Sequence, residues 1–332
     1  MNLHKLFAHI AMVITLVCIS AFANAATLTV TSTDDDLSDD DDCTLREAVA
    51  NVNNDTAIYD ECGEPDVSGS DEIVLSAGTF CLTSELELNK DMTVRGDGSS
   101  STILDGGNHT DSSSDCSASS NRVIKVGVAG FTIALEGMTV MGGKTAESGG
   151  GIWVENTTNF SLSDVILKKN TITSPIDHVT GGGIHVEYDS TLTVDASEVN
   201  YNAIEITGTT SYDGYGAGIY ISYGSTLTVS DSTVTYNTIT AETGAGLGAG
   251  IMSYSETTST DTQSTITITG SEISNNEITT ADSSSGFPSF GGAGLYMMNS
   301  LSVSVSDSQI KDNTVSTAGY AFAGGVFLYY CD

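Results

Sequence analysis

Large side chains recur at one position of a repeated motif that begins at about Gly149. Each copy has a small-residue turn ending in Gly, followed by a short apolar segment whose second residue is large. In chain order, these second residues are Trp153, His185, Tyr220, Met252, Tyr296 and Phe327. Glu155 and Glu187 follow two residues later in the first two copies. Because aromatic rings stack on sugar faces and carboxylates accept hydrogen bonds from hydroxyls, this column is a candidate contact surface for a glycan or a surface protein.

A structural role for the same column is the alternative. The residues on either side of each ring are mostly aliphatic, so on a strand they would point inward and the ring outward. Rings stacked in successive copies could then pack on one another or lie beneath loops of variable length. The sequence leaves both roles open.

Candidates for catalysis are sparse in the repeats. A polysaccharide lyase needs a Lys or Arg base beside carboxylates that hold Ca²⁺, and a glycoside hydrolase needs clustered Asp residues. Beyond residue 140 the basic residues are Lys144, Lys168, Lys169 and Lys311. Lys168 and Lys169 directly precede Asn170, and we expect them at a solvated strand end. Asp177 and His178 are an isolated pair in a loop. We therefore assign no catalytic residue. A binding, adhesion or structural module is predicted, with a carbohydrate-active enzyme, lyase before hydrolase, as the alternative.

Apolar residues at every second position place these side chains on strands. Such alternation indicates β-strands, three in each copy with turns between them. The first aliphatic pairs are Ile152/Val154, Ile184/Val186, Ile219/Ile221 and Leu295/Met297, and the next are Phe160/Leu162, Leu192/Val194, Leu227/Val229, Ile266/Ile268 and Val303/Val305. A polar insertion near Glu256–Thr262 places Ile266 farther from the start of its copy than the equivalent residues of the other copies. One copy cannot bury its apolar face, but stacked copies can, with like residues about 4.8 Å apart. The predicted fold is all-β, a parallel β-helix with three strands per turn.

One Asn recurs at a constant place in the copies. The column contains Asn170, Asn202, Asn237, Asn276 and Asn313. Stacked amides can hydrogen-bond along a coil, and Asn tolerates left-handed turns. We expect this column to be structural.

The chain is strongly acidic, with a formal net charge of −33. This charge argues against nucleic acid and anionic membranes as partners, and it is compatible with loosely bound Ca²⁺. The densest acidic run is Asp34–Asp42. A calcium loop starting at Asp36 would place Glu47 at the twelfth position, but Asp41 stands at the sixth, where Gly is needed. We expect a solvated acidic loop and assign no metal site and no cofactor.

Residues 1–25 have the features of a secretory signal peptide. Lys5 is followed by the apolar run Ile10–Ile19 and by the small-residue site Ala23-Asn24-Ala25. The run is shorter than the roughly 20 residues of a membrane span, so no transmembrane segment is expected after cleavage. Export implies an oxidising compartment. The disulfide candidates are Cys43, Cys62, Cys81 and Cys116, with their pairing open and Cys331 left over.

Residues 26–70 are predicted to cap the β-helix of residues 71–332. Thr44 and Glu47 have capping-box spacing, and Leu45, Ala48 and Val49 recur at helical spacing. An amphipathic helix here would cover the exposed end of the coil. Arg46 and Glu47 are expected to form a local ion pair or cap rather than to catalyse a reaction.

Two stretches carry a family resemblance. Cys-Thr-Leu-Arg-Glu-Ala-Val at 43–49, followed by Asp71–Leu75 and Gly78-Thr79-Phe80, resembles the CSLREA domain of bacterial surface and secreted proteins. Thr44 and Val49 depart from its Ser and Ile. The Gly-Gly-Gly-Ile units resemble pectin-lyase-like β-helices, including those of polymorphic outer-membrane proteins. The resemblance implies a right-handed coil and secretion or display on the outer-membrane surface, with no agreed chemistry. Because a new unit starts at Gly325, we expect the chain to be a fragment.

Overall fold

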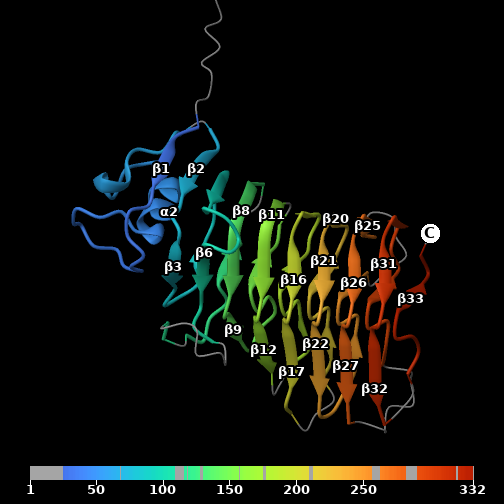
Figure 1. Ribbon diagram of the computed structural model, residues 1–332. Coiled ribbons are helices and arrows are strands. Elements are labelled where there is room, and N and C mark those ends of the chain that lie inside the picture. Colours follow the sequence, from blue (N-terminus) through green and yellow to red (C-terminus); the bar gives the residue numbers. More distant parts are fainter. Residues whose placement is uncertain are drawn as a thin grey trace, which may run out of the picture.

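The computed structural model describes residues 25–67, 69–108, 116–117, 119–127, 130–156, 158–174, 177–208, 212–255, 262–281, 290–318 and 321–331. The predicted signal peptide lies outside these residues except for Ala25. Parallel strands stack along one axis from the N-terminal to the C-terminal end of the molecule (Figure 1). The all-β prediction is therefore confirmed.

Sheet A is the largest of four sheets in the described part of the chain and forms one long side of the coil. Its main path runs through β1 (Thr27–Thr29), β2 (Asp71–Val74), β5 (Met92–Arg95), β8 (Thr132–Met141), β11 (Asn159–Lys168), β15 (Thr191–Asp195), β20 (Thr226–Ser230), β25 (Thr265–Thr269) and β30 (Ser302–Ser306). Its other strands are β3 (Gly78–Cys81), β6 (Thr102–Asp105), β16 (Glu198–Asn200), β21 (Thr233–Thr235), β26 (Glu272–Ser274) and β31 (Gln309–Lys311).

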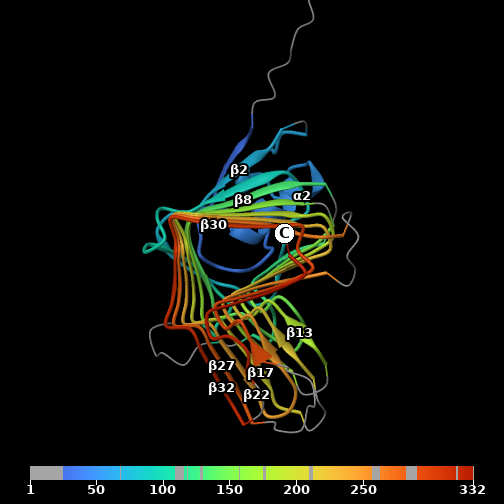
Figure 2. The same ribbon diagram turned by 90° about the vertical axis from the view of Figure 1, so that its right-hand side faces the viewer.

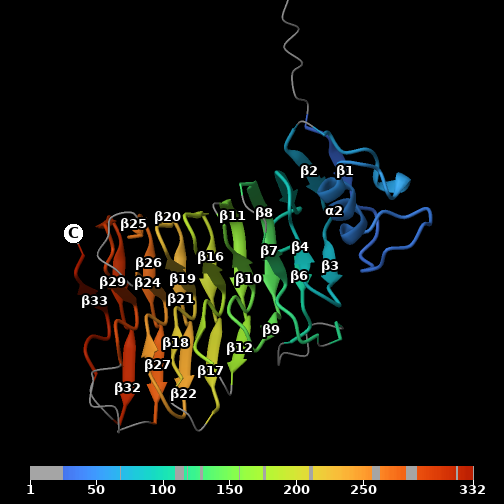
Figure 3. The same ribbon diagram turned by 180° about the vertical axis from the view of Figure 1, so that it is seen from behind.

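Sheets B and C complete the turns. Sheet B, seen from behind in Figure 3, contains β4 (Leu86–Glu87), β7 (Ile124–Val126), β10 (Ile152–Val154), β14 (Ile184–Val186), β19 (Ile219–Ser222), β24 (Ile251–Tyr254), β29 (Leu295–Met298) and β33 (Val326–Tyr329). Sheet C contains β9 (Lys144–Thr145), β12 (Thr171–Ser174), β17 (Ala203–Ile206), β22 (Thr238–Ala241), β27 (Glu277–Thr280) and β32 (Thr314–Thr317).

A fourth sheet, sheet D, adds a feature that the sequence did not indicate. Its strands are β13 (Val179–Thr180), β18 (Gly214–Tyr215), β23 (Gly246–Leu247) and β28 (Phe290–Gly291). Each has only two residues, which is too short for an alternating pattern to be recognised. Viewed along the coil axis, the strands of sheet C and β13 lie in a lobe apart from sheet A (Figure 2).

Like residues stack on like residues in the main coil, as predicted. Ile184 pairs with Ile152 below it and Ile219 above it, and all three are fully buried. The delayed Ile266 pairs with Leu227, as the polar insertion required. Residues 256–261 of that insertion lie outside the described part of the chain. These columns belong to one apolar cluster that runs the length of the coil.

The Ile residues of sheet C belong to a second apolar cluster. Ile172, Ile204 and Ile239 pack with residues of sheet D and the following turns, such as Val179 and Ala217. The structure separates this column from the main apolar cluster. The reason is that the chain leaves sheet A, crosses sheet C and returns through sheet D before it reaches sheet B.

The Asn column forms the predicted hydrogen-bonded ladder. Asn202 Nδ2 donates to Asn237 Oδ1 at 3.0 Å and to the Leu167 carbonyl at 3.0 Å. Asn237 repeats this pattern with Asn276 and Val199. The left-handed conformation is adopted by the preceding residue, such as Tyr201 with φ 55°, and not by the Asn. The amide side chain therefore satisfies the buried backbone of the corner that its neighbour turns.

Helix α2 (Leu45–Asn54) covers the N-terminal end of the main core, as predicted. The side chain of Thr44 accepts from the Glu47 backbone, and Glu47 accepts from the Thr44 backbone, which completes the capping box. Leu45, Ala48 and Val49 are buried in the main apolar cluster. The short helix η1 (Asp60–Cys62) follows α2.

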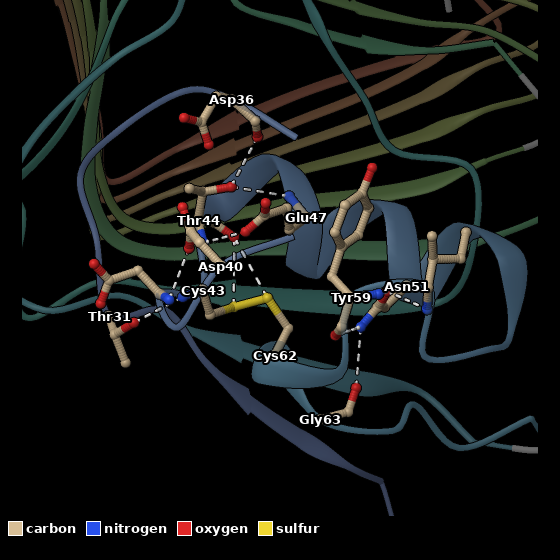
Figure 4. The surroundings of a disulfide bond; sticks show 12 residues. Thr31, Asp36, Asp40, Cys43, Thr44, Glu47, Asn51, Tyr59, Cys62 and Gly63 are labelled. Carbon is tan, nitrogen blue, oxygen red and sulfur yellow. Dashed lines mark hydrogen bonds between the residues drawn. A yellow bond between two sulfur atoms is a disulfide. The ribbon is translucent and has the colours of Figure 1, made fainter. Parts of the chain in front are cut away.

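The cap is fixed by a disulfide and by an ion pair. Cys43 and Cys62 form one disulfide, shown in Figure 4, and Cys81 and Cys116 form the second. Cys331 is the free cysteine among the described residues. Arg46 binds Asp35 with Nε 2.7 Å from Oδ1. The predicted cap is confirmed for Glu47, whereas the ion-pair partner of Arg46 is Asp35.

Candidate functional site

A cavity of about 500 Å³ lies on the outer side of sheet B. Its lining includes Trp153 from β10, His185 from β14 and Tyr220 from β19. β13 of sheet D supplies Val179 and Thr180 on the other side. The cavity is therefore formed where β13 of sheet D approaches the column of large side chains.

The column is in the predicted register but is not an open surface. Trp153 pairs with His185, and His185 pairs with Tyr220, so the three side chains come from successive turns. They point away from the main core, as expected. However, His185 is 5% exposed and Tyr220 is 6% exposed, whereas Trp153 is half-buried. The column is largely covered because the chain returns from sheet D directly above it.

Glycines make this close return feasible. Gly181 has φ +68°, and a Cβ on it would lie 2.6 Å from the His185 backbone nitrogen. Gly216 has φ +63°, and a Cβ there would lie 2.9 Å from the Tyr220 Cβ. Only glycine combines a left-handed backbone with this lack of space. The small-residue turns that mark the repeats thus hold sheet D against the column.

The rings in the column also pack on one another. His185 stacks on Tyr220 with ring centroids 5.2 Å apart, and Trp153 meets His185 edge-on at 6.3 Å. The rings therefore pack on one another, as the structural alternative proposed, and they also line the cavity. Farther along, Tyr296 stacks on Phe327 at 4.9 Å. These two rings do not line the cavity, because Met252 and β24 lie between them and Tyr220.

Four polar side chains form a connected group in the cavity. Thr180 Oγ1 is 2.5 Å from His185 Nδ1 and donates to Ser148 Oγ at 2.9 Å. His185 Nε2 lies 3.3 Å from Glu187 Oε1, without hydrogen-bond geometry. Within the described residues, this buried nitrogen has no hydrogen-bond partner. Glu187 thus joins the cavity as part of the predicted site, whereas Glu155 does not line it.

Arg122 is a cavity residue that the sequence did not reveal. Its guanidinium carbon lies 4.5 Å from the centre of the Trp153 ring, and the side chain is 5% exposed. Ion pairs join it to Glu85 at 3.1 Å and to Glu147 at 2.8 Å. No motif surrounds Arg122 in the sequence, so only the stacking of turns brings it to Trp153.

The isolated Asp177–His178 pair lines the same cavity. The carboxylate nearest the His178 ring belongs to Asp213 of the next turn, with Oδ2 3.4 Å from Nδ1. His178 Nδ1 also accepts from the Asp213 backbone nitrogen at 2.9 Å. The His178 ring is parallel to that of Tyr215, with centroids 6.4 Å apart. The imidazole is therefore partnered by Asp213, whereas Asp177 Oδ1 accepts from the His178 backbone nitrogen at 2.8 Å.

Burial raises the pKa of two tyrosines near the cavity. Burial is the largest cause for both Tyr220 and Tyr215, and the Asp213 carboxylate raises the pKa of Tyr215 further. Desolvation disfavours the charged phenolate. Both phenols therefore stay protonated at neutral pH, and the Tyr215 hydroxyl donates to Asp213 Oδ2 at 2.8 Å.

The described residues contain neither a cluster of typical metal ligands nor a membrane-spanning helix. No group of three or more His, Cys, Asp or Glu side chains there is placed to hold a metal ion. None of the described helices has the length and apolar character needed to span a bilayer. The weakly bound Ca²⁺ expected from the acidic composition stays a prediction.

Comparison with protein families gives one match. The model for the right-handed β-helix region matches residues 106–332, which span sheet D and the cavity. This match confirms the predicted handedness of the coil. Comparisons with curated proteins and with solved structures found no match.

Proposed function

Because the chain belongs to the right-handed β-helix family, we propose that it is an extracellular binding module that takes a saccharide into the cavity beside Trp153. The observation that carries the proposal is the wall of Trp153, His185 and Tyr220 in a cavity of about 500 Å³. Ligand pockets commonly enclose roughly 300–1,000 Å³ and combine aromatic walls with a few polar groups.

The polar groups suit the hydroxyls of a sugar. Trp153 Nε1 and His185 Nε2 are buried nitrogens without hydrogen-bond partners among the described residues. Leaving such groups unpaired costs about 1–3 kcal/mol each, so a ligand that bonds them regains this free energy. Glu187 adds a hydrogen-bond acceptor to the same cavity, and the Tyr220 side chain adds to its wall.

Export to the cell exterior is part of the proposal. The signal-like residues 1–25 and the resemblance of residues 43–80 to CSLREA domains support secretion or display on the outer-membrane surface. The two disulfides are compatible with an oxidising compartment. An extracellular glycan would then be available to the protein as a ligand.

A carbohydrate-active enzyme is less well supported. Lys168 and Lys169 do not line the cavity, and Arg122 is held by two carboxylates, so a lyase would lack a free base there. Incubation with polyuronates and Ca²⁺ would report a lyase by the ultraviolet absorbance of unsaturated ends. We expect no such absorbance above a blank.

Calorimetric titration of the protein against a panel of oligosaccharides tests the proposal. Trp153→Ala is expected to weaken binding by about tenfold or more, because it removes the most exposed of the three side chains Trp153, His185 and Tyr220 in the cavity wall. Tyr296→Ala is the matched control, since Tyr296 occupies the same position of its motif outside the cavity. Equal affinity of the wild type and Trp153→Ala would refute the proposed site.

A further inference from the structure

The cavity is acidic, which restricts the class of saccharide that it can bind. Glu147, Asp177 and Glu187 all line it. Among the described residues that line the cavity, Arg122 is the one with a Lys or Arg side chain. Since Arg122 already pairs with Glu85 and Glu147, its positive charge is offset within the wall.

Two of the carboxylates lack such a partner. Within the described residues, no Lys or Arg forms an ion pair with Asp177 or Glu187. The Glu187 side chain is only 15% exposed, so little water screens its charge. A carboxylate in such a position is stabilised by a cation that enters the cavity.

A second, independent observation concerns the histidine next to this carboxylate. The His185 side chain is 6% exposed, and its Nε2, 3.3 Å from Glu187 Oε1, has no hydrogen-bond partner in the described part of the chain. Its other nitrogen is held by Thr180. A polar group of the ligand at this place could contact both the imidazole and the carboxylate.

We infer that the ligand is an amino sugar with a free ammonium group, such as a glucosamine oligosaccharide. This inference rests on the proposed function and specifies its ligand. The ammonium group would bind Glu187, with Asp177 at the exposed side, while the sugar lies against Trp153, whose ring also carries the Arg122 guanidinium 4.5 Å from its centre. Charge-assisted hydrogen bonds are the stronger kind, and they also exclude the opposite charge. Polyuronates would be repelled by the same carboxylates.

Calorimetry with four ligands of equal length tests the inference. The ligands are the tetramers of glucosamine, N-acetylglucosamine and galacturonate, together with tetralysine. The full chain is expected to bind the glucosamine tetramer about tenfold more tightly than the N-acetylated one and to give no signal with the uronate. Tetralysine controls for general attraction to a chain of net charge −33 and is expected to bind weakly and independently of Trp153.

Variants separate the inference from the proposed function. Glu187→Gln, and independently Asp177→Asn at the exposed rim, are expected to lower the affinity for the glucosamine tetramer, the former by about tenfold. Glu198→Gln on sheet A is the matched control. If the N-acetylated tetramer binds equally well and Glu187→Gln changes nothing while Trp153→Ala abolishes binding, the inference is wrong and the proposed function stands. If Trp153→Ala has no effect on any saccharide, the proposed function is wrong and the inference fails with it.

Discussion

The hydroxyl of Thr180 lies 2.5 Å from Nδ1 of His185, although the two residues belong to different sheets. Thr180 is in β13 of sheet D, and His185 is in β14 of sheet B. The tight turn at Gly181 between these strands brings the two side chains together. The contact ties the second lobe to the main coil at the cavity, and it orients the imidazole toward Glu187.

Thr180→Val should weaken saccharide binding while the coil stays folded. The substitution keeps the size of the side chain but leaves His185 Nδ1 buried without its partner, which costs about 1–3 kcal/mol. We expect a lower melting temperature and at least fivefold weaker binding, measured by thermal unfolding and calorimetry. Thr193→Val, on sheet A in the same turn, is the control and should change neither. Unchanged binding by Thr180→Val would show that the orientation of His185 is irrelevant.

Gly181→Ala should destabilise the wall of the cavity. The residue has φ +68°, and the added Cβ would lie 2.6 Å from the His185 nitrogen and the Ile184 carbonyl oxygen. Strain of this kind costs about 1–3 kcal/mol, because the backbone must move. Gly325→Ala is a matched control, since Gly325 ends the same motif and a Cβ there meets nothing within 4 Å. Urea denaturation should separate the two variants, and equal midpoints would contradict the argument.

Asn237→Ala should break the ladder at its centre. Asn237 is fully buried, donates to Asn276 and the Val199 carbonyl, and accepts from Asn202. Because its loss leaves several buried groups unpaired, we expect a cost of about 2–4 kcal/mol. The measurement is the free energy of unfolding, with the outward-facing Asn159→Ala as control. A cost below about 0.5 kcal/mol would mean that the ladder is dispensable.

Asp35 should contribute stability that disappears in acid. Burial opposes its ionisation, but hydrogen bonds from Arg46 and Thr83 outweigh burial and hold the pKa below its ordinary value of 3.8. A lowered pKa means that the folded protein binds this proton less readily than the unfolded chain. The stabilisation is therefore complete above pH 3.8 and is lost as the pH falls through the lower folded pKa.

Unfolding measured as a function of pH checks this expectation. Asp35→Asn should be less stable than the wild type by about 1–2 kcal/mol at neutral pH, and the difference should shrink as the solution is acidified. Asp34→Asn, at the exposed neighbouring position of the same acidic run, is the control and should follow the wild type. A difference between Asp35→Asn and the wild type that stays constant with pH would contradict the assignment.

The strands and ladders of the main coil were readable from the sequence because each depends on local, repeated chemistry. The alternation of Ile184 and Val186 predicts a strand, and their recurrence as Ile219 and Ile221 predicts the stacking partner. The Asn column and the capping box of Thr44 and Glu47 follow the same logic. Each of these features needs only the spacing of residues along one segment and the register between neighbouring turns.

The cavity was decided by the tertiary structure alone. Its residues come from several turns, and Arg122 reaches Trp153 only because the turns stack. Sheet D consists of two-residue strands, in which no period can be recognised, and the lobe it forms covers His185 and Tyr220. The sequence determined which side chains leave the main core, because neighbours on a strand point to opposite faces. What lies over those side chains depends on the path of the connecting segments, which no periodic pattern encodes.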